Sequence, residues 1–232
     1  MKVGSVKEIK RHEYRVGLTP ANVKAYVAAG HSVYIEKGAG TAVGFEDSEY
    51  EGAGAKILST REEIFDTCDM IVKVKEPQPE EYDLFKEGQI LYTYLHLAAE
   101  KEVTEALKKR KVKGVAYETI ETPDGQLPLL KPMSEIAGRL SVQEGAKFLE
   151  RPFGGRGVLL GGVPGVERGK VAILGGGTVG TNAAKMAIGL GAEVTILDVN
   201  VNRLEYLDDI FGGRVTTLYS NRGNIDKVLD ES

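Results

Sequence analysis

Short apolar runs in the first half of the chain alternate with stretches whose apolar residues recur at helical spacing. The runs predict strands at Met1–Val6, Ser32–Ile35, Met70–Val74, Gln89–Tyr94 and Gly114–Tyr117. One helix is predicted from Thr19, as N-cap with Pro20 behind it, to Gly30, and an amphipathic helix covers residues 99–109. Strands that alternate with helices are typical of a mainly parallel, doubly wound sheet.

The pattern changes after the turn Thr122-Pro123-Asp124-Gly125. The prolines between Pro128 and Pro132 favour a boundary there, so we predict two domains, residues 1–128 and 129–232. A long helix is expected from Ser134, as its N-cap, to Leu149. The glycine-rich residues 153–169 then predict a loop and hairpin. A role in subunit contacts, or in shaping an active-site cleft, is the alternative for this segment.

A glycine motif dominates the second half. The strand Lys170–Leu174 leads into G-x-G-x-x-G, a helix from Thr178 to Leu190 follows, and a second strand ends at Asp198. In such a motif Gly175 allows the tight turn, Gly177 lets the main chain approach a pyrophosphate, and Gly180 lets the helix pack on the sheet. The free N–H groups at the helix start favour phosphate. The motif therefore predicts a bound dinucleotide.

Details of this motif refine the prediction. The helix is expected to pack on the sheet through Val179, Ala183, Met186, Ala187 and Leu190. A carboxylate at position 198 accepts hydrogen bonds from ribose hydroxyls and repels a 2′-phosphate, which favours NAD over NADP.

The fold class expected is α/β, with two Rossmann-like doubly wound domains. The 63 residues from Lys170 onward provide a strand, helix, strand, helix and a third strand at Arg214–Leu218. A full Rossmann domain has a second such half. We therefore expect the NAD-binding domain to be truncated, with the first half only, and the sequence to be a fragment or to lack a remainder that contributes to the site.

Composition narrows the possible partners. The chain has 30 basic and 34 acidic residues spread along its length, a net charge of −4, which argues against nucleic acid. No leader or membrane-spanning run is recognised. Cys68, the single cysteine, has no metal-ligand spacing around it and is expected to be a half-buried structural thiol. These features favour a cytoplasmic location and predict no metal site.

Three polar residues of the first domain lie where strands or loops meet a cleft. Arg15 offers the planar pair of donors that binds a carboxylate, although a surface ion pair is its simpler interpretation. Lys75 ends the apolar strand before Glu76-Pro77, where open α/β sheets bind ligands; a solvated strand end is its alternative. His96 follows a strand and is the natural proton carrier, against a purely structural histidine.

Several segments resemble the alanine dehydrogenase family, which also holds the transhydrogenase α subunit. They are Lys73–Pro77, Tyr94–Ala99, Pro132–Arg139, Leu160–Val166, and the opening with Lys7-Glu8 and Arg15–Pro20. The match covers essentially the whole chain, in the family's order and spacing. The Gly-Gly-Gly-Thr-Val-Gly-Thr-Asn run from Gly175 is more similar to alanine dehydrogenase than to transhydrogenase.

The resemblance implies reversible, NAD-dependent oxidative deamination of L-alanine to pyruvate and ammonia. It implies that Arg15 holds the substrate carboxylate, that Lys75 binds and polarises the substrate, and that His96 transfers protons. An aspartate that the family supplies from the second Rossmann half lies beyond this chain. The family is commonly hexameric, so a homo-oligomer is expected. The alternatives are a transhydrogenase α-type NAD(H) subunit and a non-catalytic nucleotide-binding fragment.

The resemblance also implies cofactor contacts beyond the glycines and Asp198, namely Ser134, Thr178, Val179, Arg203 and Ser220. Ser134 has a competing interpretation as a helix cap, and Ser220 as a loop hydroxyl after a strand. Arg203 is alternatively a solvated helix residue, but its nearness to Asp198 favours a place along the adenosine.

Overall fold

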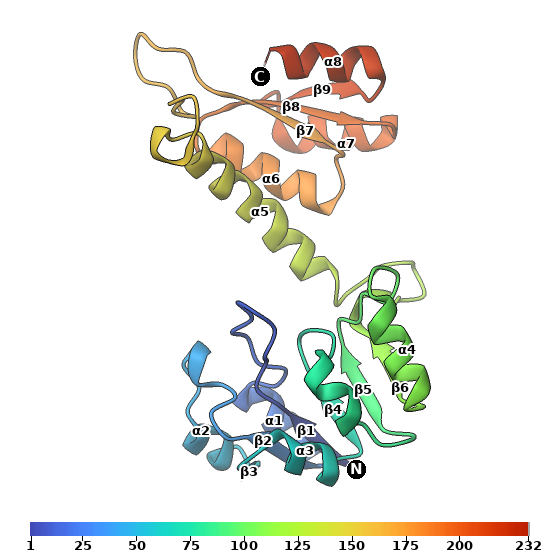
Figure 1. The fold of residues 1–232 in the computed structure, drawn as a ribbon. Coiled ribbons are helices and arrows are strands. Elements are labelled where there is room, and N and C mark those ends of the chain that lie inside the picture. The colour runs from blue at the N-terminus through green and yellow to red at the C-terminus, as the bar shows by residue number, and fades with distance from the viewer. Residues whose placement is uncertain (232) are drawn as a thin grey trace. The chain divides into compact units, whose positions relative to one another are not determined.

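The computed structural model describes residues 1–231 and divides into two compact units, Met1–Leu127 and the residues from Pro128 onward (Figure 1). Each unit has its own parallel sheet and its own hydrophobic core. The α/β class predicted from the sequence is confirmed.

The first unit contains a six-stranded sheet of order β3-β2-β1-β4-β5-β6, in which every neighbouring pair is parallel. Its strands are β1 (Lys2–Ser5), β2 (Ser32–Glu36), β3 (Lys56–Leu58), β4 (Met70–Val72), β5 (Ile90–Thr93) and β6 (Lys113–Ala116). Its helices are α1 (Pro20–Ala28), α2 (Asp47–Gly52), α3 (Arg61–Thr67) and α4 (Lys101–Lys109), with the 3-10 turns η1 (Thr41–Val43), η2 (Pro79–Leu84) and η3 (Tyr117–Thr119).

Apolar side chains on both faces of this sheet explain why it is doubly wound. Ile71 and Val72 are neighbours in β4 and point to opposite faces, so Val72 joins the core under α1 and α2 while Ile71 joins the core under α3, η2 and α4. The strand order reverses between β1 and β4. In open α/β sheets this reversal opens a crevice at the carboxyl ends of the two strands.

Local signals placed several elements correctly and missed others. Helix α1 begins as predicted, since Thr19 and Asn22 form a reciprocal capping box and Pro20 occupies the first turn. The prediction omitted α2, β3 and α3, which are only three to seven residues long. Cys68 is buried rather than half-buried, and burial raises the pKa of its thiol to about 12, which leaves it unreactive.

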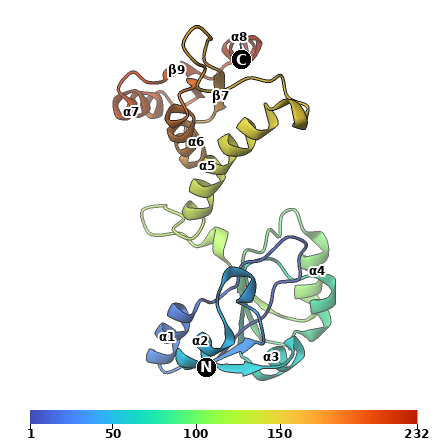
Figure 2. The ribbon, with the colours of Figure 1, turned by 90° about the vertical axis from the view of Figure 1, so that its left-hand side faces the viewer.

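The second unit contains a three-stranded parallel sheet of order β7-β8-β9 (Figure 1). Its elements are α5 (Lys131–Phe148), η4 (Arg151–Phe153), β7 (Lys170–Leu174), α6 (Thr178–Gly189), β8 (Glu193–Asp198), α7 (Val201–Phe211), β9 (Thr216–Tyr219) and α8 (Arg222–Asp230). Figure 2 shows its helices α5 and α6 side by side. Among the described residues β7 pairs with β8 only, so these strands form the first three of a Rossmann order. A bridge between Val163 and Val166 closes the predicted hairpin in the glycine-rich segment.

Two expectations about helices of this unit are wrong. Ser134 is not the N-cap of α5: the helix begins at Lys131, because Pro132 fits the first turn, and the cap residue Leu130 makes no side-chain bond. In α6, Val179 and Leu190 are largely exposed, whereas Thr181 and Asn182 are buried with the alanines. The polar pair is satisfied locally: Thr181 donates to Gly177 O (2.8 Å) and Asn182 to Thr178 O (2.9 Å).

Glycines let α6 lie close to its neighbours. A Cβ on Gly180 would lie 1.9 Å from the carbonyl oxygen of Gly175, and a Cβ on Gly138 of α5 would lie 2.2 Å from that of Val179. Gly180 therefore lets α6 pack closely on β7, as predicted, through Ile173 as well as on the turn at Gly175, and Gly138 allows the same close approach between α5 and α6. That seam also carries a hydrogen bond from Arg139 Nε to Asn182 Oδ1 (3.2 Å).

Candidate functional site

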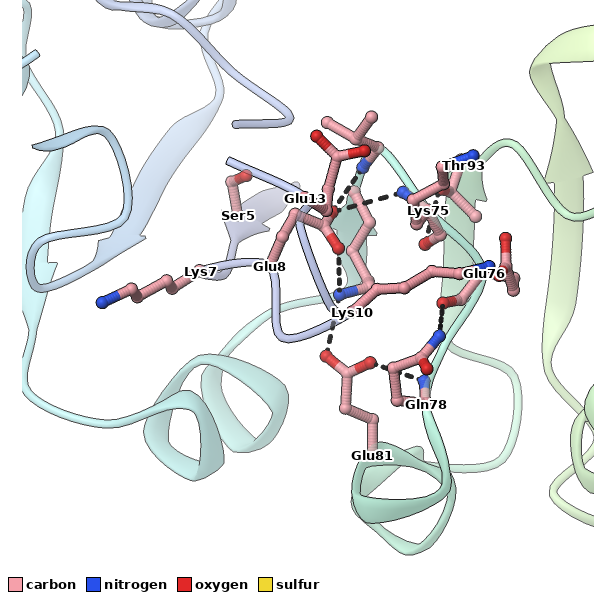
Figure 3. Close-up of polar contacts among 12 residues, drawn as sticks. Ser5, Lys7, Glu8, Lys10, Glu13, Lys75, Glu76, Gln78, Glu81 and Thr93 are labelled. Atoms are coloured by element: carbon pink, nitrogen blue, oxygen red, sulfur yellow. Dashed lines mark hydrogen bonds and ion pairs between the residues drawn. The ribbon is translucent and has the colours of Figure 1, made fainter. Parts of the chain in front are cut away.

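Charged side chains gather at the carboxyl edge of the first unit's sheet, where the strand order reverses. The loop after β1 supplies Glu8, Lys10, Glu13 and Arg15, the segment after β4 supplies residues 73–76, and the turn after β5 supplies His96. Figure 3 shows Glu8, Lys10 and Glu13 close to Lys75 and Glu76. All three residues predicted for substrate chemistry lie in these segments. The crevice position predicted for Lys75 is the one the topology produces.

Arg15 makes the ion pair that its simpler interpretation predicted. Its Nε and Nη2 donate to the two carboxylate oxygens of Glu13 at 2.8 and 2.6 Å. The hydrogen bond from Arg15, together with a weaker influence of Lys75, lowers the pKa of Glu13, so this carboxyl is ionised. The guanidinium is thus oriented by an acidic residue two positions earlier in the same loop, and it stays partly exposed.

Lys75 is held at its main chain and has a free side chain. Its N–H donates to Glu8 Oε1 (3.3 Å), and its carbonyl accepts from Thr93 Oγ1 (3.0 Å). Across the part of the chain that the structure describes, its half-buried ammonium makes no hydrogen bond or ion pair. A cation next to the Glu13–Arg15 pair that lacks a partner of its own is suited to receive an anionic or carbonyl ligand.

His96 is joined to the same cluster through Glu76. Its Nδ1 lies 2.9 Å from Glu76 Oε2, and Lys10 binds the other oxygen of that buried carboxylate. Burial alone would raise the pKa of Glu76, but the hydrogen bonds from Lys10 and His96 outweigh it and lower this pKa. An ionised acceptor favours the proton on Nδ1, which leaves Nε2 as the ring nitrogen outside this contact.

The main chain at His96 is unusual for a residue other than glycine. Its φ is +51°, in the left-handed region. Glu118 accepts hydrogen bonds from the N–H groups of both Leu95 and His96, at 3.0 and 2.7 Å, and so braces this conformation. The imidazole is 43% exposed and stacks near Tyr94, with ring centroids 6.2 Å apart.

A buried ionic network underlies the cluster. Lys73, fully buried, places its ammonium 3.2 Å from Glu8 Oε2 and 2.8 Å from Glu81 Oε1. Arg61 continues the network, 3.7 Å from Glu81 and 3.8 Å from Glu36. Burial raises the pKa values of Glu8 and Glu36, although Lys73 opposes the shift at Glu8 and the Lys7 N–H opposes it at Glu36.

Sequence reasoning missed the acidic half of this site. Four partners of the predicted residues were not selected, namely Glu8, Glu13, Glu76 and Glu118, nor was Glu81, which pairs with Lys73. One signal was available: Lys73 interrupts an apolar strand that is buried on both sides, and a buried lysine requires an acidic partner. The partners themselves are up to 67 residues away in sequence, so their identity came only from the fold.

The glycine turn of the second unit is held by Asp198 and Arg203. The main-chain N–H of Gly176 donates to Asp198 Oδ2 (2.6 Å), and that of Asn200 donates to Oδ1 (2.8 Å). These bonds, Asn200 first, lower the pKa of Asp198. Arg203 donates to Gly176 O (2.6 Å) and Thr181 Oγ1 (2.7 Å), so it lies across the turn rather than in solvent.

Most of the predicted cofactor residues border one cavity of about 880 Å³ along β7, between α5 and α6. Among them are Ser134, Gly175, Gly177, Thr178, Val179 and Gly180. Asp198 and Arg203 do not line it but lie at the far side of the glycine turn, where Ser220 donates its N–H to the Asp198 carbonyl (2.9 Å).

The turn fits a dinucleotide by a direct steric test. Gly175 has φ of +98°, and a Cβ built on Gly177 would enter open space in front of the α6 N-terminus. Space at that position is what a pyrophosphate approaching the main chain requires. No group of three or more potential metal-ligating side chains occurs among residues 1–231, and no helix in that range has the length and apolar character needed to cross a bilayer.

Comparisons with known proteins give the same family for both units. The family described as alanine dehydrogenase/PNT, N-terminal domain, matches residues 4–137, and the corresponding C-terminal domain matches residues 141–232. The chain is 62% identical, over all 232 residues, to alanine dehydrogenase of Methanococcus maripaludis and 58% identical to that of Staphylococcus haemolyticus. It covers 62% of the length of each.

Solved structures agree with this assignment. An L-alanine dehydrogenase superposes with a TM-score of 0.94 at 57% identity, over the whole chain and 64% of that protein. A transhydrogenase from Sinorhizobium meliloti, at 24% identity and a TM-score of 0.79, shares the fold. The chain thus spans about three fifths of the length of the relatives it matches. On the two domain matches, the chain belongs to the alanine dehydrogenase/PNT family.

Proposed function

We propose that the protein is an NAD-dependent alanine dehydrogenase, which interconverts L-alanine and water with pyruvate and ammonium. The observation that carries the proposal is the group of Arg15, Lys75 and His96 at the switch point, with the Lys75 ammonium lacking a partner among the described residues. Support for alanine dehydrogenase over a transhydrogenase subunit comes from relatives of that name at 57–62% identity, against 24% for the transhydrogenase.

In the amination direction, Arg15 binds the pyruvate carboxylate by two parallel hydrogen bonds, beside Glu13. Lys75 donates to the carbonyl oxygen and makes its carbon more electrophilic. Attack by ammonia gives a carbinolamine, and loss of water gives a cationic iminium that is the better hydride acceptor. His96 supplies and removes the protons through Nε2, while Glu76 holds the ring at Nδ1.

We assign substrate binding to the first unit and the cofactor to the second. Gly175, Gly177 and Gly180 with the N-terminus of α6 would hold the pyrophosphate, with Ser134, Thr178 and Val179 along the neighbouring cavity. Asp198, Arg203 and Ser220 would contact the adenosine ribose. The bound cofactor would supply the hydride as NADH in amination and accept it as NAD⁺ in deamination. The acidic side chain at position 198 supports NAD over NADP.

The test is loss of NADH absorbance with pyruvate, with and without ammonium, using the protein expressed from its native gene. Ammonium-dependent turnover is expected. NADH binding without ammonium-dependent turnover would contradict the proposal.

We also propose, from the resemblance to the family, that the protein assembles as a homo-hexamer and is located in the cytoplasm. Light scattering after gel filtration measures the assembly, and a monomeric mass would contradict it. Cell fractionation tests the location.

A further inference from the structure

On its β1 side, the main chain that follows β4 is held by a side chain and not by a neighbouring strand, and this fixes the position of Lys75. The last residue pair between β1 and β4 is Ser5 with Val72. Beyond it the chain after β1 leaves the sheet, so the N–H groups of Val74 and Lys75 have no strand neighbour on that side. Glu8 takes the place of the strand: its Oε1 accepts from Val74 N at 2.6 Å and from Lys75 N at 3.3 Å (Figure 3).

The opposite side of the same segment is also fixed. Thr93, fully buried in β5, donates from Oγ1 to the carbonyl oxygen of Lys75 at 3.0 Å. The main chain of Lys75 is thus held from β5 and from the loop after β1, while its ammonium stays free of partners among the described residues. This arrangement suits a residue that acts through its side chain from a rigid base.

Glu8 can serve in this way only if its charge is balanced, because a buried carboxylate is otherwise neutralised by protonation. Lys73 provides the balance, with its ammonium between Glu8 Oε2 and Glu81 Oε1. Lys73 precedes Val74 directly, so one short segment contains the counter-ion, the anchored N–H groups and the acting side chain.

We propose that Glu8 is a positioning residue that sets the reach of the Lys75 ammonium into the substrate site, with Lys73 as its buried counter-ion. The inference rests on the proposed function, since it assigns Lys75 a substrate. The inference gives Glu8 a role separate from folding, because Glu8 fixes the main-chain position from which the Lys75 side chain extends.

The test compares Glu8→Gln with Glu36→Gln in the protein expressed from its native gene. The amide introduced by Glu8→Gln has one oxygen and cannot accept both from Val74 N and from Lys73, so the segment is expected to shift. Glu36 belongs to the same network and loses the same charge, but its hydrogen bond is to Lys7 N and its ion pair is to Arg61, while Lys73 acts on it only through longer-range attraction. It is therefore the matched control.

For Glu8→Gln we expect kcat/KM for pyruvate to fall roughly 10- to 100-fold with a raised KM, because small misplacements of a catalytic group are costly. The NADH dissociation constant should stay within about twofold, on the same preorganisation argument. Pyruvate should also lose its ability to protect Lys75 from an amine-modifying reagent, followed by peptide mass spectrometry. Glu36→Gln should keep the wild-type KM and protection.

Thr93→Val provides a second route if Glu8→Gln does not fold. It removes the other anchor of the Lys75 main chain without a change of charge or shape, and should raise KM in the same direction. The inference is overturned if Glu8→Gln and Glu36→Gln lose activity alike with unchanged KM, or, where only Thr93→Val can be tested, if its KM is unchanged. A wild-type protein without ammonium-dependent turnover would overturn the proposed function instead, and this inference with it.

Discussion

The candidate site of the first unit is made of charged side chains, whereas that of the second unit is made largely of main chain. Around Lys75 the positions of atoms depend on ion pairs, within one loop for Arg15 with Glu13 and between two segments for Lys73 with Glu8. Around Gly177 they depend on the absence of side chains and on N–H groups at a helix start. The difference matches the two ligands proposed. The substrate is a small molecule that reacts where it is bound, whereas the dinucleotide is bound through phosphates that take no part in the reaction.

The two sites are also expected to tolerate different substitutions. A side-chain site loses function when one charged group is removed, while its fold persists if the group is exposed. A main-chain site fails when an atom is added. The predictions below use these opposite sensitivities to test whether the two regions behave as different kinds of site.

The largest effect is expected from Lys75→Ala. Removal of the ammonium that polarises the substrate should lower kcat/KM for pyruvate by roughly 10²- to 10⁴-fold, the range of a lost acid or electrophilic group. NADH binding, measured by fluorescence titration, should be nearly unchanged. Lys108→Ala, at an exposed ion pair with Glu105, is the control and should retain full activity. Equal loss of turnover and NADH binding in Lys75→Ala would remove the assigned role.

Gly180→Ala tests the opposite sensitivity. The added Cβ would lie 1.9 Å from the Gly175 carbonyl oxygen, a contact that only a main-chain shift relieves, and overpacking of this kind costs about 1–3 kcal/mol or more. NADH affinity and the midpoint of thermal unfolding should both fall. Gly189→Ala, in the same helix with nothing within 4 Å of its Cβ, should instead be neutral or stabilise by about 0.5–1 kcal/mol. Similar melting points for the two variants would refute the steric argument.

Asp198→Ala tests the acidic residue that, with Arg203, holds the glycine turn of the second unit. Loss of the carboxylate should improve NADPH binding relative to NADH by about tenfold, equivalent to ~1.4 kcal/mol. Asp198→Asn keeps an acceptor for the Gly176 N–H and serves as the control for loosening of the turn. Both dissociation constants can be measured by fluorescence. Unchanged discrimination in both variants would exclude Asp198 from the ribose site.

The smallest effect concerns alkaline pH and the first unit. Burial raises the pKa of Cys68 from 9.0 to about 12, above its value in the unfolded chain, so its contribution to stability is complete below pH 9 and is lost as pH rises toward 12. At pH 10, one unit above the thiol pKa in the unfolded chain, the loss of unfolding free energy is about 1.4 kcal/mol. Calorimetric melting points between pH 8 and 11 should therefore fall less steeply for Cys68→Ala than for wild type. Tyr50, whose pKa is raised to about 12 by burial, contributes to the slope that remains, as do other tyrosines whose pKa values burial raises, namely Tyr26, Tyr82, Tyr94 and Tyr117.

The two regions also differ in how far the sequence alone predicted them. The glycine turn follows from residues within about thirty positions of one another, each with a steric purpose that spacing discloses. Its strands, its helix and the positive φ of Gly175 were all predictable. Which residues of α6 are exposed was not predictable, because Thr181 and Asn182 are buried and their polar groups bond to carbonyl groups of the same helix and its cap.

In the first unit five of the six strands were predictable, and so was the position of Arg15, Lys75 and His96 at the sheet edge, but β3 and the groups that support these residues were not. Lys75 stands out because it ends an apolar strand. Glu8 and Glu81 do not stand out, because acidic residues are common and their pairing with Lys73 arises when three loops meet at the sheet edge. The N-cap expected at Ser134 shows the converse: a residue with a good local preference can be overruled by an earlier start of the helix at Lys131.

The left-handed main chain at His96 has a consequence for evolution and engineering. A side chain in this region is strained by about 1–3 kcal/mol relative to glycine, and asparagine also tolerates it better. Replacement of His96 by either would therefore relieve this strain while it removed the proposed proton carrier. If His96 has the proposed role, selection for heat resistance alone would favour inactive variants, and activity at this position opposes stability.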